Sequence, residues 1–131
     1  MAAKVPAGPA YVGAVTLASS AANLDRAVAW YQDVLGFTLL YRVDEIGWCE
    51  LSTCVPGVNY GISLVDKPKA ASGIVPTWGV ADIDAARTAL ETKGVRFDGP
   101  TVTYPGMVRL ATFFDPDGNA HMFFQSLAAK D

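Results

Sequence analysis

Residues 23–37 read NLDRAVAWYQDVLGF, and residues 82–97 read DIDAARTALETKGVRF. Each stretch opens with a residue suited to capping a helix N-terminus, Asn23 or Asp82, and continues with apolar residues at helical spacing. Each then reaches a Gly that suits the end of a helix. This internal repeat predicts two amphipathic helices of about three turns, one in each half of the chain.

Both predicted helices lie in the same arrangement of apolar, β-rich segments. One such segment precedes each helix, and three follow it, separated by Gly, Pro and Asp. The expected strands are residues 11–17, 37–43, 47–53 and 59–65 in the first half and 74–80, 96–104, 107–114 and 120–127 in the second.

The order βαβββ occurring twice predicts an α+β fold. A chain of 131 residues with 51% apolar residues is long enough for one core and too short for two ordinary domains. We therefore expect a single domain, with module one at about 11–65, a linker at 66–73 and module two at about 74–126.

Composition limits the partners and the location. The net charge is −3, and no Lys/Arg run is present that could neutralise a phosphate backbone, so nucleic acid is not expected. No stretch approaches the roughly 18 consecutive apolar residues of a membrane span, so we expect no membrane partner and a cytoplasmic protein. Cys49 and Cys54 would lie roughly 16 Å apart in an extended strand, too far for a disulfide, and are expected to be buried free thiols.

Two short motifs carry a family resemblance. AWYQDVLGF at 29–37 and FFDPDGN at 113–119, together with the internal repeat, resemble the vicinal oxygen chelate superfamily. That superfamily includes glyoxalase I, extradiol dioxygenases, fosfomycin-resistance enzymes and bleomycin-resistance proteins. The resemblance covers roughly residues 11–126. It implies two modules that form a partly open, barrel-like sheet around a concave cavity, and a homodimer whose cavities borrow residues from the partner.

The resemblance also places the metal ligands of metal-using members. Those positions fall on Ala14 or its neighbour, on Val75 and on Met122, and the segment at 59–65 offers no carboxylate or imidazole. Transition metals in such sites prefer imidazole nitrogen or carboxylate oxygen, and the chain contains a single His. We expect no metal and no cofactor.

Glu50 is the leading candidate for a polar functional group. Strand alternation puts Glu50 and Trp48 on one face and Cys49 and Leu51 on the other. If the first face lines the cavity, desolvation beside the indole would raise the pKa of Glu50 and suit it to acid–base chemistry or to anchoring a ligand. A solvated strand carboxylate explains Glu50 equally well.

Two other polar residues have alternative interpretations. His121 lies on the opposite strand face from Met122, which favours a structural role toward the helix layer or a subunit contact. A register slip of one residue would instead make His121 a base or a lone ligand, and a dimer could recruit it from the second subunit. Arg109 could pair with Glu50, bind an anionic group, or occupy an edge position facing solvent.

Aromatic and Met side chains predict the character of the pocket. Trp30, Tyr31 and Trp78 are expected in the core. The remaining rings and thioethers suit a flat apolar or aromatic ligand. The expected ligand-binding residues are Trp48, Glu50, Tyr60, Met107, Phe113, Met122 and Phe124.

Three functions follow. The leading hypothesis is a metal-independent protein similar to the bleomycin-resistance type, which sequesters an apolar or aromatic small molecule. The alternative is a glyoxalase-like lyase, isomerase or dioxygenase, metal-independent with Glu50 as general base or metal-dependent with unusual ligands. The third is a regulatory or structural dimer with a vestigial cavity. Glu50→Gln separates the first two, because an enzyme would lose turnover while still binding.

Overall fold

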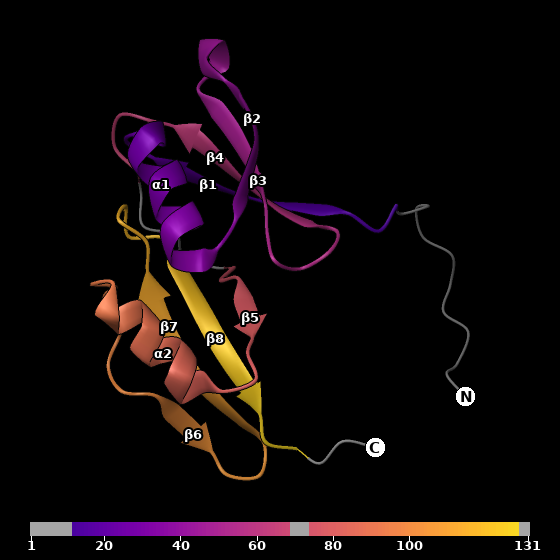
Figure 1. The fold of residues 1–131 in the computed structure, drawn as a ribbon, viewed down its shortest axis with the longest axis vertical. Helices are drawn as coiled ribbons and strands as arrows, with labels where there is room; N and C mark the ends of the chain where they lie inside the picture. The colour runs from indigo at the N-terminus through magenta and orange to yellow at the C-terminus, as the bar shows by residue number, and fades with distance from the viewer. Residues whose placement is uncertain (1–11, 69–73, 129–131) are drawn as a thin grey trace.

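The structure is a computed structural model that describes residues 12–68 and 74–128. Figure 1 shows the two modules stacked along the long axis of the molecule. Module one contains β1 (Val15–Ala21), α1 (Leu24–Leu35), β2 (Thr38–Val43), a short 3-10 helix η1 (Asp44–Ile46), β3 (Trp48–Ser52) and β4 (Val58–Leu64). Module two contains β5 (Thr77–Gly79), α2 (Ile83–Thr92), β6 (Val102–Tyr104), β7 (Val108–Phe114) and β8 (Ala120–Ser126).

Each module builds one four-stranded mixed sheet. The strand orders are β1-β4-β3-β2 and β5-β8-β7-β6, so the two sheets have equivalent topology. In each sheet the first strand pairs in parallel with the last, and the other pairs are antiparallel. The α+β fold expected from the repeat is confirmed. Both sheets are open, so the barrel-like closure is only partial.

The first strand lies further along the chain than the sequence predicts. The segment at 11–17 was expected, whereas β1 covers Val15–Ala21 and residue 11 lies outside the described part. The polar residues Ser19 and Ser20 still belong to the strand because each pairs in register with a residue of β4. Pairing with a neighbouring strand therefore outweighs local apolar patterning here. Most of the expected linker, residues 69–73, also lies outside the described part.

Both helix starts are as predicted. Asn23 Oδ1 accepts the backbone N–H of Arg26 at 2.9 Å, and Asp82 Oδ1 accepts that of Ala85 at 3.1 Å. Each bond satisfies one of the backbone donors that a helix N-terminus leaves open. Helix α1 ends at Gly36, whose φ of 74° is left-handed and favours glycine.

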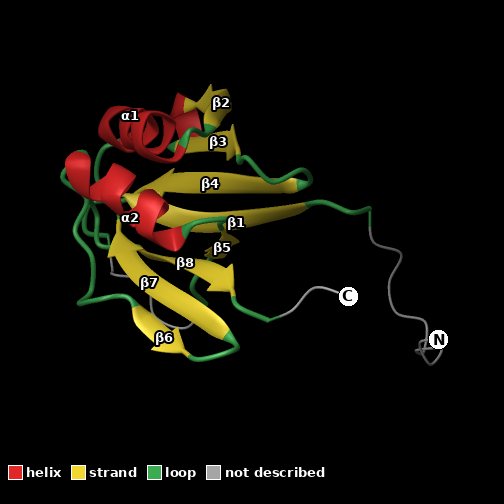
Figure 2. Ribbon diagram, turned by 60° about the horizontal axis from the view of Figure 1, so that its bottom comes forward, coloured by secondary structure: helices red, strands yellow, loops and turns green. Residues whose placement is uncertain are grey.

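The two helices lie on the same side of the strands, as the turned view in Figure 2 shows. The buried face of α1 packs on Cys49, Leu51 and Ile62 of its own sheet, and Ile83 of α2 packs in a second cluster on the other sheet. Trp30 and other partly buried residues contact both clusters. The core is therefore continuous across the two modules and leaves the opposite side of each sheet without a helix.

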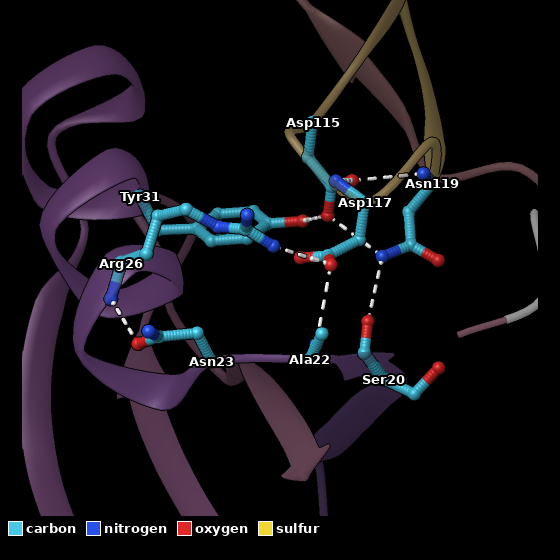
Figure 3. A network of polar contacts seen from close by, with 8 residues as sticks. All are labelled: Ser20, Ala22, Asn23, Arg26, Tyr31, Asp115, Asp117 and Asn119. Atoms are coloured by element: carbon cyan, nitrogen blue, oxygen red, sulfur yellow. Dashed lines mark hydrogen bonds and ion pairs between the residues drawn. The ribbon is translucent and has the colours of Figure 1, made fainter. Parts of the chain in front are cut away.

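A buried carboxylate joins the modules at the turn between β7 and β8 (Figure 3). Asp115 Oδ2 accepts the hydroxyl proton of Tyr31 on α1 at 2.8 Å and the amide of Asn119 at 2.7 Å. Asp115 Oδ1 accepts backbone N–H groups of Asp117 and Asn119 at 2.9 and 2.8 Å. The Asn119 amide also donates to the carbonyl of Ser20 on β1 at 3.0 Å. Module two thus presents a preformed turn to the helix and first strand of module one.

A second carboxylate of the same turn reinforces this junction. Asp117 Oδ1 accepts the guanidinium of Arg26 at 2.6 Å and the backbone N–H of Ala22 at 3.1 Å. The Asp117 side chain is nearly fully buried, so this ion pair is screened less than one on an open surface. Figure 3 shows Arg26 and Tyr31 pointing from α1 toward the two aspartates.

The helices and the cysteines also bear on the expectations from the sequence. No described helix has the length and apolarity that a membrane crossing requires. Cys49 and Cys54 are both free, as expected; Cys49 is buried, but Cys54 is exposed. Cys54 was expected to be buried and is not, because it lies in the loop that follows β3 rather than in the strand.

Candidate ligand-binding face

The side of each sheet that carries no helix is the candidate site, and we call it the helix-free face. In β3, Cys49 and Leu51 point toward α1 and are fully buried. Strand alternation therefore puts Trp48 and Glu50, both partly buried, on the helix-free face of the first sheet. The sequence predicts this same grouping, with Trp48 and Glu50 on one face of the strand and Cys49 and Leu51 on the other.

Glu50 lies near the centre of that face and is held by neutral donors from the other three strands. Its Oε2 accepts the Asn59 amide of β4 at 2.9 Å and the Thr16 hydroxyl of β1 at 3.4 Å. Its Oε1 accepts the Tyr41 hydroxyl of β2 at 3.0 Å. Parallel pairing of β1 with β4 brings Thr16 directly beside Asn59, and antiparallel pairing places Tyr41 opposite Glu50. The carboxylate therefore joins side chains from across the sheet.

These contacts lower the pKa of Glu50. The hydrogen bond from Asn59 is the largest cause, and hydrogen bonds from Tyr41, Thr16 and Trp48 act in the same direction. Desolvation raises the pKa but does not outweigh them. The raised pKa expected from burial beside an indole is therefore wrong, because the expectation did not include the donors from neighbouring strands.

In each module an aromatic ring lies across a glycine. A Cβ on Gly61 would come within 2.1 Å of the Trp48 ring, so that ring covers the backbone of β4 at Gly61. A Cβ on Gly79 would come within 2.9 Å of the Phe124 ring. Both rings depend on a position without a side chain, since the backbone could not otherwise be approached so closely.

The helix-free face of the second sheet is mostly apolar. Register places Met122 between Thr112 and Thr77, and Phe124 between Leu110 and Gly79. Val102 pairs with Leu110 and Tyr104 with Val108, which extends the same face across β6. The members of this face are Thr77, Val102, Tyr104, Val108, Leu110, Thr112, Met122 and Phe124.

A cavity of about 350 Å³ lies at the seam between the modules. Thr16 and Ala18 of β1 line one side, and Ile74, Pro76 and Ala120 line the other. Because Thr16 also donates to Glu50, the seam cavity adjoins the polar centre of the first sheet. The sequence did not predict the three residues that donate hydrogen bonds to Glu50, which are Thr16, Tyr41 and Asn59. Strand alternation would identify them only if the pairing of the strands were already known.

Two expected ligand-binding residues belong to the core instead. Phe113 pairs with His121 on β8, so it faces the helices, and it is 0% exposed among Phe97 and Phe123. Tyr60 is 2% exposed, and its hydroxyl lies 2.9 Å from that of Tyr31 in the core, although Tyr60 also borders the seam cavity. The expectation for Phe113 fails because its strand was assigned the wrong face.

Met107 is 66% exposed in the turn between β6 and β7, at the rim of the second sheet rather than on its face. Trp48, Glu50, Met122 and Phe124 lie on the helix-free faces. Their role in binding stays a prediction.

His121 lies on the helix side, opposite in direction to Met122, and is 0% exposed. Its Nδ1 accepts the indole N–H of Trp78 at 3.1 Å, and its Nε2 lies 2.9 Å from the Tyr31 hydroxyl. Desolvation lowers the pKa of His121 to about 4. A buried neutral imidazole with both nitrogens engaged fits the structural role favoured by the sequence.

Arg109 does not pair with Glu50. It faces the helix side of β7 and forms a two-pronged ion pair with Asp84 of α2 at 2.9 and 3.0 Å. β7 lies between β6 and β8, so an edge position is also wrong. The sequence did not reveal this pair because the two residues are 25 positions apart and meet only through the packing of α2 on the sheet.

Comparison with known families matches residues 14–123 to the model of the Glyoxalase/Bleomycin resistance protein/Dioxygenase superfamily. The chain belongs to this superfamily. The match spans both modules and includes the two motifs that carry the resemblance in the sequence. A comparison with curated proteins found no match.

Several solved structures share the fold. An antibiotic binding protein from Streptomyces sp. CB03234, TnmS3, superposes with a TM-score of 0.74 at 23% identity, covering 91% of this chain and 99% of its own. A superfamily member from Sphaerobacter thermophilus DSM 20745 gives 0.72 at 25% identity, covering 90% and 98%. The fosfomycin resistance protein FosX from Listeria monocytogenes gives 0.75 at 14% identity, covering 89% and 95%.

The residues of this superfamily member do not fit a metal centre. Ala14 and Val75 lie just before β1 and β5, and the strand positions on the helix-free faces carry Thr16 and Thr77 instead. Met122 is the remaining expected position. Within residues 12–68 and 74–128, no three His, Cys, Asp or Glu side chains come together in a group that could hold a metal. Hydroxyl and thioether groups alone are poor ligands for the metals that imidazole and carboxylate sites bind.

Proposed function

We propose that this protein binds an apolar or aromatic small molecule on its helix-free faces and acts by sequestering it. The supporting observation is the contrast between the two faces. The second sheet offers Met122 and Phe124 on an apolar surface, and the first offers Trp48 beside a hydrogen-bonded carboxylate. Such a surface suits a flat ligand that needs large apolar contact and a few fixed polar groups. Two structural neighbours are an antibiotic binding protein and a fosfomycin resistance protein, which agrees with this proposal.

Catalysis with Glu50 as a general base has less support. A base is most effective when its pKa lies near the working pH, and the hydrogen bonds to Glu50 shift its pKa away from that range. His121 is the other candidate base, but it is buried on the helix side and both its nitrogens are engaged. Sequestration requires neither group to exchange a proton.

We also propose that the protein is a homodimer in which the helix-free face of module one covers that of module two in a second copy. Val102 and Tyr104 are about half exposed on the second face, next to the apolar side chains of β7, and a contiguous exposed apolar patch marks an interaction surface. A two-fold arrangement of this kind would create two equivalent enclosed cavities. Light scattering on the purified protein should give the mass of two chains, and Leu110→Arg should give one. A single-chain mass for the unaltered protein would contradict the dimer.

The binding proposal is tested with 2-naphthalenemethanol, a neutral aromatic probe, titrated into isotopically labelled protein and followed by NMR. The Trp48 indole N–H and the Met122 methyl signals should shift in a saturable way. Met122→Lys should weaken binding by about tenfold or more, because a charge would be placed in the apolar contact. Ile46→Lys is the matched control, since Ile46 is exposed on η1, outside the strands of both sheets. Absence of saturable shifts at both reporter groups would refute the proposal.

A further inference from the structure

We propose that the ligand carries a positively charged nitrogen group, which binds at Glu50 against the rings of Trp48 and Tyr41. This inference rests on the proposed function, because it names the chemical class of the molecule that the helix-free face takes. It would make the protein selective for organic cations with an aromatic or apolar body.

Glu50 carries a negative charge that no described neighbouring side chain compensates. The side chains that donate to Glu50, among them those of Thr16, Tyr41 and Asn59, are all neutral. They stabilise the ionised carboxylate without cancelling its charge. None of the ion pairs among residues 12–68 and 74–128 includes Glu50. The helix-free face of module one therefore carries the negative charge of the Glu50 carboxylate, and no described side chain neutralises it.

The two arginines in the strands, Arg42 and Arg109, each pair with carboxylates of their own module. Arg42, on the strand next to Glu50, pairs with Asp25 and Asp44. Arg109 pairs with Asp84 on the helix side of the other module. A positive partner for Glu50 must therefore come from outside the described chain.

Two aromatic rings lie beside the Glu50 carboxylate. The Trp48 ring lies across Gly61, and Gly61 is the β4 residue directly opposite Glu50, so the indole runs alongside the carboxylate. Tyr41 lies opposite Glu50 on the other side and is 48% exposed, so part of its ring remains available. A cation above an aromatic face is attracted by the ring as well as by the carboxylate. An ammonium group seated here gains both contributions together.

The same geometry disfavours other ligand groups. An anion would meet the charge of Glu50 with no basic side chain to offset it. A neutral hydroxyl would add one more neutral donor to those already present and leave the charge uncompensated. A metal ion would find one carboxylate and no imidazole or thiolate in reach, because no metal-holding group exists among the described residues.

The experiment compares three probes that share one aromatic body: 2-naphthylmethylamine, protonated at pH 7, neutral 2-naphthalenemethanol, and anionic 2-naphthylacetate. Dissociation constants are measured by NMR titration at low salt and at high salt. We expect the amine to bind about tenfold or more tighter than the alcohol, the acetate to bind most weakly, and the preference for the amine to shrink with salt. Equal affinity of amine and alcohol, or tighter binding of the acetate, would overturn the inference.

Variants then locate the effect. Glu50→Gln should remove most of the difference in affinity between amine and alcohol. Glu45→Gln, which removes the same charge from the exposed helix η1, should leave the difference unchanged. If Glu50→Gln does not fold, the comparison of the three probes on the unaltered protein still decides the question. If none of the three probes binds the unaltered protein, the proposed function itself is refuted. If the probes bind but with no preference for the positive charge, only this inference is refuted.

Discussion

Trp78 donates its indole N–H to Nδ1 of His121 across 3.1 Å. Because an indole nitrogen only donates, Nδ1 carries no proton, and the imidazole proton lies on Nε2 facing the Tyr31 hydroxyl at 2.9 Å. Tyr31 in turn gives its own proton to Asp115 at 2.8 Å. One directed chain of hydrogen bonds therefore connects β5, β8, α1 and the β7–β8 turn, and it requires a neutral His121.

This chain predicts that the protein loses stability in mild acid. The pKa of His121 is about 4 when folded against 6.5 for an ordinary imidazole, so its contribution is complete above about pH 6.5. Below that pH the unfolded chain takes up a proton that the folded chain does not. At about 1.4 kcal/mol per pKa unit, the free energy of unfolding should fall by about 3 kcal/mol between pH 7 and pH 4 from this residue.

The measurement is urea denaturation at a series of pH values for the unaltered protein and for His121→Gln. Gln offers one acceptor and one donor group but does not titrate, so the variant should be less stable at pH 7 and show a smaller loss toward pH 4. The titration of carboxylates changes the free energy of unfolding of both proteins alike, so the difference between the two proteins reports on His121. Identical pH dependence in the two proteins would contradict a neutral, buried His121.

Asp115→Asn should destabilise the junction between modules. The carboxylate accepts from Tyr31, from the Asn119 amide and from two backbone N–H groups, and it is nearly fully buried. An amide at this position would turn one N–H group toward existing donors, and we expect a cost of about 1–3 kcal/mol in the free energy of unfolding. Asp98→Asn is the control, because Asp98 is exposed and undergoes the same change of charge. Equal stability of the two variants would show that the turn does not depend on this charge.

Gly61→Ala should displace the Trp48 ring. The new Cβ would lie 2.1 Å from Cη2 and 2.3 Å from Cζ2 of Trp48, so the indole must move off β4. We expect a changed NMR shift of the Trp48 indole N–H, a stability loss of about 1–3 kcal/mol, and weaker binding of the naphthalene probes. Ser63→Ala, on the same strand opposite Trp48, already has a Cβ and should leave the ring in place. An unshifted indole signal in Gly61→Ala would contradict the stacked position.

Purified protein should contain no stoichiometric transition metal. The expected ligand positions carry Ala14, Val75 and Met122, and the nearby strand positions on the helix-free faces carry Thr16 and Thr77. None of these side chains offers an imidazole or a carboxylate. Elemental analysis on protein prepared without an affinity tag, followed by calorimetric titration with Zn²⁺, Mn²⁺, Fe²⁺ and Ni²⁺, tests this. One tightly bound metal per chain would contradict the prediction.

Much of this architecture could be predicted because its signals are local. Helix caps at Asn23 and Asp82 lie within three residues of the N–H groups they satisfy, and apolar spacing marks the buried helix faces without reference to the rest of the chain. Alternation alone predicted that Glu50 and Leu51 lie on opposite faces of their strand, and likewise His121 and Met122, since neighbouring strand residues point in opposite directions. The internal repeat then predicted the topology of both modules.

The candidate site was predicted only in part. Alternation shows which residues share a face but not which face a helix covers, so Phe113 was assigned to the ligand surface although it packs against His121 under the helices. The pKa of Glu50 was expected to rise because its donors were unknown, and two of them, Thr16 and Asn59, lie on a parallel pair of strands 43 positions apart.

The sequence by itself therefore determined the repeat, the helices and the alternation along each strand, because those depend on residues a few positions apart. Only the tertiary structure decided which strand faces are covered, how Asp115 joins the modules, and why Glu50 stays ionised. Those outcomes depend on strand register and helix packing, which bring together residues that are distant along the chain.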